Sequence, residues 1–110
     1  MSESLAQNEA TNEQGQTGWL ILARHESAAR IVDTLLDFPP HREFNQTELA
    51  EIANVSRQSV NAHLGLLLDV KILEPVDGTT PQRYRFVPES PVSEAIIRLD
   101  GAMNAVGPDS

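Results

Sequence analysis

The polar side chains best suited to selective recognition stand together in the stretch Ser56-Arg57-Gln58-Ser59, with Asn61 and Ala62 just behind it. An arginine can donate two parallel hydrogen bonds to guanine, and a glutamine or asparagine can pair in the same bidentate way with adenine. Each such pair contributes about 1–3 kcal/mol of discrimination between bases. These residue types therefore suggest hydrogen-bonded reading of a double helix, provided that one element presents them together.

The apolar spacing around this stretch predicts that element, a helix over 56–69. Three apolar residues recur at helical intervals and share its buried side: Val60, Leu64 and Leu67. At about 100° per residue, the residues on or near the opposite side are Gln58, Asn61, Ala62 and Gly65. Ser56 is suited both to cap the helix and, with the helix N-terminus, to meet a phosphate, and both roles stay open.

A shorter helix is expected directly before this one. Asn45 is a suitable N-cap, and Glu48, three residues on, can bond back to the amide of the cap. The residues expected to face inward from this helix are Leu49, Ile52 and Ala53. Asn54-Val55 ends it, because asparagine tolerates the left-handed backbone that a tight turn needs.

Upstream, residues 19–23 predict a short first helix, and Ser27 is expected to cap a second one. The buried stripe of this second helix is expected to hold Ala28, Ile31, Val32, Leu35 and Leu36. Pro39-Pro40 ends the helix, since neither proline offers an N–H.

Downstream, alternation predicts an antiparallel ribbon with strands over 73–77 and 82–87, and Arg42-Glu43-Phe44 is a candidate third strand. The return strand alternates two arginines with two aromatic residues, so one face is cationic and the other apolar: Arg83, Arg85, Tyr84 and Phe86. Ser90-Pro91 then begins a last helix, as an N-cap followed by proline at the first helical position. The apolar face of that helix is expected to hold Val92, Ile96, Leu99 and Met103.

The length of 110 residues allows one domain with a modest core. Residues 1–16 and 107–110 are expected to be tails, the first of them disordered, around a domain over 17–106. The absence of cysteine excludes a disulfide framework and thiolate metal sites. No apolar run is long enough to span a membrane, and the N-terminus lacks the features of a signal peptide, so we expect a cytoplasmic protein without a membrane partner.

The charge is the observation least favourable to nucleic-acid binding, because 16 acidic residues against 8 basic ones give a formal net charge of −8. Residues 38–90 are the least acidic stretch, with seven acids and five bases. Seven arginines stand against one lysine, Lys71, and this acid-rich, lysine-poor composition is similar to that of proteins from salt-loving archaea. In molar salt, net charge matters less than local contacts because long-range fields are screened.

The order of two short helices, a short turn and a two-stranded ribbon is that of a winged helix-turn-helix. The segment 47–64 (TELAEIANVSRQSVNAHL) resembles the winged-helix regulators of the MarR and ArsR type, and the match continues through 72–76 and 83–86. The ending over 84–92 is similar to haloarchaeal members of that group. Such proteins usually carry glycine where this chain has Asn54 and Lys71.

This resemblance implies a mainly α fold with a small β-wing and a sequence-specific transcriptional regulator of double-stranded DNA. The recognition helix 56–69 would enter the major groove, and the wing 73–87 would lie on the backbone or minor groove. The implied DNA-binding residues are Ser56, Arg57, Gln58, Ser59, Asn61, Ala62, Arg83 and Arg85. Half-sites about 34–36 Å apart imply a homodimer, for which 19–23 and 90–106 are the expected surfaces. A small-molecule effector stays unknown.

The sequence leaves a second class of function open and argues against a third. The second is a winged-helix protein-interaction module in a transcription-related complex without DNA contact, which the negative charge favours. The third, an enzyme, is not expected, because no catalytic triad order, glycine-rich phosphate loop or paired carboxylates appear. No cofactor or metal site is expected either, since His25, His41 and His63 lack the spacing of a ligand set.

Overall fold

The computed structural model describes Leu20 and residues 24–106. Both expected tails, 1–16 and 107–110, lie outside the described residues. So does the predicted first helix over 19–23, except for Leu20, which is helical and exposed.

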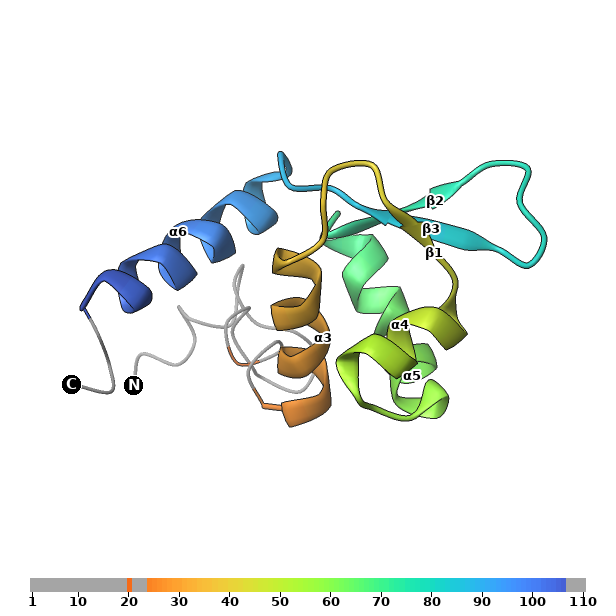
Figure 1. Ribbon diagram of the computed structural model, residues 1–110, viewed down its shortest axis with the longest axis horizontal. Coiled ribbons are helices and arrows are strands. Elements are labelled where there is room, and N and C mark those ends of the chain that lie inside the picture. The colour runs from red at the N-terminus through yellow and green to blue at the C-terminus, as the bar shows by residue number, and fades with distance from the viewer. Residues whose placement is uncertain (1–19, 21–23, 107–110) are drawn as a thin grey trace, which may run out of the picture.

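The described part of the chain is mostly helical, with one small antiparallel sheet of three strands, as the sequence predicts at this level of detail. Along the chain the elements are α3 (Glu26–Leu36), β1 (Glu43–Phe44), α4 (Gln46–Ala53), α5 (Arg57–Asp69), β2 (Leu73–Val76), β3 (Arg83–Phe86) and α6 (Pro91–Val106). Helices α3, α4 and α5 pack together beside the sheet, the β2–β3 hairpin extends from one side of this group, and α6 extends from the other (Figure 1).

The start of α4 confirms the predicted capping box. Asn45 Oδ1 accepts a hydrogen bond from the amide of Glu48 at 2.8 Å, and Glu48 Oε1 accepts one from the amide of Asn45 at 3.0 Å. Two amides that the helix leaves without an internal partner are therefore both satisfied. This fixes where α4 begins.

The turn between α4 and α5 is short and depends on Asn54. This residue has φ 59° and ψ 46°, the left-handed conformation expected for it. The amide of Val55 bonds to the carbonyl of Ala50 at 3.1 Å, in the pattern that usually ends a helix with glycine. Ser56 then caps α5, so the three residues 54–56 join the two helices.

The end of α5 has the same arrangement at Lys71, whose φ is 68°. The amide of Ile72 bonds to the carbonyl of Leu67 at 2.9 Å, and that of Lys71 to the carbonyl of Leu68 at 3.1 Å. The chain therefore leaves α5 as it would with glycine at this position. Because Lys71 has a Cβ, however, its left-handed backbone is sterically unfavourable.

Lys71→Gly is expected to stabilise the protein by about 0.5–1 kcal/mol, because glycine adopts the left-handed conformation without a Cβ clash. Urea unfolding measures this difference. Lys71→Ala is the control, since it removes the charge and keeps the Cβ, and its stability should stay near that of the parent. A loss of stability in the glycine variant would contradict the account.

The sheet has the strand order β1-β3-β2, so β3 lies in the middle. Its register pairs Leu73 with Phe86 and Glu74 with Arg85, while β1 places Glu43 opposite Arg85 on the other side. The predicted alternation on β3 is confirmed: Tyr84 and Phe86 are buried, and the two arginines are half-exposed.

The core lies between the three packed helices and the inner face of the sheet. Its buried members are Ile31, Val32, Leu35, Phe38, Phe44, Leu49, Ala50, Ala53, Val60, Leu67, Ile72, Leu73, Tyr84 and Phe86. Leu36 and Leu64 are partly buried against it. The buried stripes predicted for α3 and α5 are thus confirmed, and they hold α5 with its other side toward solvent.

Two predictions about individual residues are wrong. Ser27 does not cap α3, because the helix begins at Glu26 with His25 at the N-cap, two residues earlier than predicted. Ser27 Oγ bonds instead to His63 Nε2 at 2.9 Å. Ile52 does not face inward and is 45% exposed. The buried side of α4 is centred between Leu49, Ala50 and Ala53, and at 100° per residue Ile52 lies well off that direction.

Helix α6 begins as predicted, with Ser90 Oγ accepting a hydrogen bond from the amide of Ser93 at 3.2 Å. Ser93 is buried and Ile96 packs against the core, whereas every residue over 97–106 is exposed. None of the helices in the described ranges combines the length and the apolar character that crossing a membrane requires.

Candidate nucleic-acid interface

The outer side of α5 carries the residues that the sequence singled out. Arg57, Gln58, Asn61 and Ala62 are exposed, and Ser59 is half-buried. Gly65 is exposed too, and a Cβ built on it would meet no atom within 4 Å. One side of the helix therefore combines long polar side chains at its start with small residues further along.

Ser56 and Ser59 are hydrogen-bonded to each other. Ser56 Oγ accepts a hydrogen bond from the amide of Ser59 at 2.9 Å and donates to Ser59 Oγ at 3.0 Å. The capping role predicted for Ser56 is therefore confirmed, whereas its contact with a phosphate stays a prediction.

Arg57 lines a cavity of about 290 Å³ between the start of α4, the start of α5 and the loop of the hairpin. The lining consists of Asn45, Gln46, Thr47, Arg57, Pro81 and Gln82, and contains no acidic residue. Arg57 makes no hydrogen bond or ion pair with any residue in the described part of the chain. Its guanidinium group is thus available to a ligand.

Arg83 is held by groups of the protein itself. Its Nη2 donates to Glu48 Oε1 and to the backbone oxygen of Glu43, each at 3.0 Å, and its Nε lies 3.8 Å from Glu43 Oε1. Because Glu48 also completes the capping box of α4, one carboxylate oxygen joins the hairpin to the start of that helix. Arg83 thereby holds the hairpin against α4.

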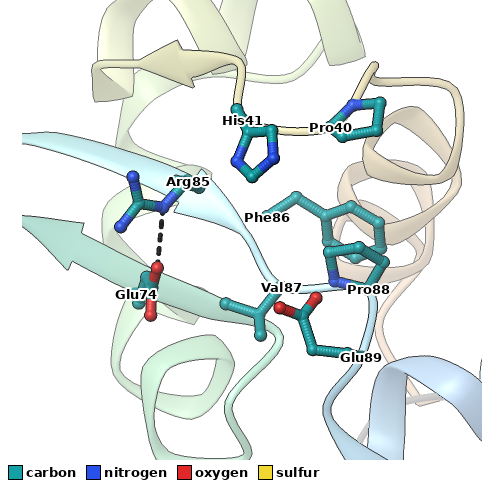
Figure 2. Close-up of a pocket in the computed structure, with 8 residues that line it drawn as sticks. All are labelled: Pro40, His41, Glu74, Arg85, Phe86, Val87, Pro88 and Glu89. Carbon is teal, nitrogen blue, oxygen red and sulfur yellow. Dashed lines mark hydrogen bonds and ion pairs between the residues drawn. The ribbon is translucent and has the colours of Figure 1, made fainter.

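Arg85 is paired across the hairpin. Its Nε donates to Glu74 Oε2 at 2.7 Å, between residues that the register places opposite each other. Figure 2 shows this pair at one side of a hollow of about 360 Å³, with His41, Phe86 and Glu89 also in its lining. The position of Glu74 on the strand opposite Arg85 was the signal in the sequence that could have revealed this pair.

These ion pairs change the character of the hairpin. Sequence reasoning predicted a cationic outer face, but each of its arginines faces at least one carboxylate. The described structure therefore leaves the cation of Arg57 free and neutralises those of Arg83 and Arg85. Contact of the two hairpin arginines with a nucleic acid stays a prediction.

The link between Arg83 and Glu48 should appear in a double-mutant cycle built from Arg83→Gln and Glu48→Gln. We expect a coupling free energy of about 0.5–1 kcal/mol in urea unfolding, because the pair is only partly exposed and shares the capping oxygen. The more exposed pair Arg30–Glu26 on α3 is the comparison and should couple by about 0.3–0.5 kcal/mol. A coupling free energy near zero, with the effects of the two single substitutions adding up to that of the double variant, would contradict an energetic link between Arg83 and Glu48.

His63 connects the inner flank of α5 to α3. It shares a hydrogen bond with Ser27, and its ring centroid lies 5.3 Å from that of His25. Burial lowers the pKa of His63, and repulsion from His25 lowers it further. No group of three or more potential metal-ligating side chains was found within the described ranges.

Comparison with protein-family models, with curated proteins and with solved structures finds no match to this chain.

Proposed function

We propose that this protein is a winged helix-turn-helix regulator that binds specific sequences of double-stranded DNA as a homodimer. The observation that carries the proposal is the outer side of α5, where Arg57, Gln58 and Asn61 are exposed together. Further support comes from the order of elements, in which two helices joined by a three-residue turn precede an antiparallel hairpin.

In this proposal α5 enters the major groove with its first turns against the base edges. Arg57 donates to guanine, and Gln58 and Asn61 pair with adenine. Ala62 and Gly65 let the helix approach the groove closely. Ser56 and Ser59 lie at the N-terminus of α5, where backbone amides are oriented to meet a phosphate.

The hairpin has a secondary part in the proposal. It lies beside α5 on the backbone or minor groove, where Arg83 and Arg85 approach the DNA while keeping their ion pairs. Because those cations are already neutralised, most of the discrimination between sequences falls to α5.

Selection of bound duplexes from random DNA tests the proposal, performed with the full chain in both low and molar potassium chloride. We expect enrichment of a site with two related halves, centred one helical turn or a multiple of it apart. A library that shows no enriched sequence at either salt concentration would refute specific DNA binding.

A second candidate function is a protein-interaction module that uses the same fold without DNA. The neutral hairpin and the net charge of −8 favour it, since both weaken attraction to phosphate. Arg57→Ala combined with Gln58→Ala separates the two functions: it should abolish selection of DNA under the first and leave protein binding unchanged under the second.

A further inference from the structure

Helix α6 is the least covered helix that the structure describes. Over 97–106 every residue is exposed, including Leu99 at 44%, Met103 at 54% and Val106 at 81%. A helical segment of about ten residues is marginal in water on its own, and Gly101 weakens this one further. The second half of α6 therefore needs a packing partner that the described residues do not supply.

The apolar residues of α6 have the spacing of a coiled-coil seam. They follow one another at intervals of four, three, four and three residues: Val92, Ile96, Leu99, Met103 and Val106. Of these, Ile96 packs against the core of its own chain and Val92 is 36% exposed. In Figure 1 this helix extends away from the group formed by α3, α4 and α5. Such spacing fits a second helix of the same kind.

The side chains on this seam and directly beside it can be compared in pairs at equal distances before and after Leu99. Val92 lies seven residues before it and Val106 seven after, so the two ends match. Ala95 lies four residues before Leu99 and Met103 four after. Ile96 and Ala102 are related in the same way, each three residues from Leu99. In an antiparallel pair with its axis at Leu99, Met103 on one helix therefore faces the small Ala95 on the other, and Ile96 faces the small Ala102.

We propose that two copies of this chain pair through α6 in antiparallel orientation, with Leu99 meeting the partner's Leu99 on the two-fold axis. The three charged residues that the structure describes on α6 lie off the seam: Glu94, Arg98 and Asp100. An uncharged seam is self-complementary, which a two-fold contact between identical acidic chains requires. Antiparallel helix dipoles favour the same orientation. The inference deepens the proposed function by naming the contact of the homodimer.

Analytical ultracentrifugation of the full chain tests the interface without DNA. We expect a dimer for the parent and at least about a 100-fold rise in its dissociation constant for Leu99→Glu, because two buried charges meet at the axis. Ile97→Glu is the matched control: Ile97 is 41% exposed, close to Leu99, but lies about 160° around the helix from it. Its dissociation constant should stay within about 3-fold of the parent. Circular dichroism checks that both variants fold.

Single cysteines test the orientation, since the chain contains none. Leu99→Cys should form an intermolecular disulfide on mild oxidation. Val92→Cys alone should not, because antiparallel pairing places two Val92 residues about 21 Å apart. A mixture of Val92→Cys and Val106→Cys should give the mixed disulfide. Cross-linking of Val92→Cys alone would show a parallel pair and overturn the orientation.

Two results would overturn the interface itself: a parent that stays monomeric at all concentrations, or equal weakening by Leu99→Glu and Ile97→Glu. A monomer would point to the residues outside the described ranges as the segment that covers α6. Since none of these measurements uses DNA, a dimer that selects no DNA sequence would refute the proposed function and leave this interface intact.

Discussion

Arg57→Ala combined with Gln58→Ala is expected to lower the affinity for the selected DNA by about 100- to 1,000-fold. Each bidentate contact to a base contributes about 1–3 kcal/mol, so the loss of two amounts to about 2–6 kcal/mol, and the expected fold-change lies within this interval. Both side chains are exposed, and neither makes a hydrogen bond within the described structure, so the free energy of unfolding should change by less than about 0.5 kcal/mol. Fluorescence anisotropy with a labelled duplex and urea unfolding measure the two quantities.

The control removes the same kinds of group from a distant helix. Arg98→Ala with Asn104→Ala takes one cation and one amide from exposed positions of α6 that lie off the apolar seam. This variant should bind DNA within about 3-fold of the parent. If both double variants lost affinity equally, charge rather than base recognition would explain the loss. In a repeated selection, Gln58→Ala alone should relax the preference at one position.

Phe44→Ala is expected to lower the free energy of unfolding by about 3–5 kcal/mol, a large share of the stability of a domain of this size. Phe44 is fully buried, and its ring meets that of Phe38 edge-on, with centroids 5.2 Å apart and planes at 76°. It also belongs to β1, the strand that pairs with β3 next to α4. Its loss therefore leaves a cavity where the sheet and the helices meet.

Urea unfolding measures this loss of stability, and two further variants serve as controls. Phe44→Leu keeps most of the volume and should cost well under half as much. Val106→Ala removes an apolar side chain that is 81% exposed, and at protein concentrations that keep the chain monomeric it should change stability by less than about 0.5 kcal/mol. A small loss for Phe44→Ala would show that β1 is not part of the cooperative core.

Features set by neighbours along the chain could be predicted from the sequence. The capping box of Asn45 and Glu48 and the left-handed turn at Asn54 each depend on residues within one helical turn. The burial of Tyr84 and Phe86 follows from alternation along one strand. Local hydrogen bonds and periodicity decide such features, so no tertiary information was needed.

Contacts between distant segments could not be predicted in the same way. Ser27 has the right chemistry for a cap, but a histidine 36 residues away offers it another partner. Ile52 fits a helical stripe whose true direction depends on where α4 lies on α3 and α5. The ion pair of Arg83 with Glu48 crosses 35 residues and requires β1 to pair with β3. Each of these depends on how the elements pack.

The neutral hairpin also bears on how strongly salt would weaken the proposed binding to DNA. Affinity falls with rising salt roughly in proportion to the number of phosphates that a protein neutralises, because each one releases condensed counterions. Because Arg83 and Arg85 are already paired with carboxylates, the protein would neutralise few phosphates and so release few of the counterions condensed on the DNA. A plot of log affinity against log salt should therefore be shallow. Base recognition by α5 would then persist in concentrated salt, where proteins that depend on phosphate contacts dissociate.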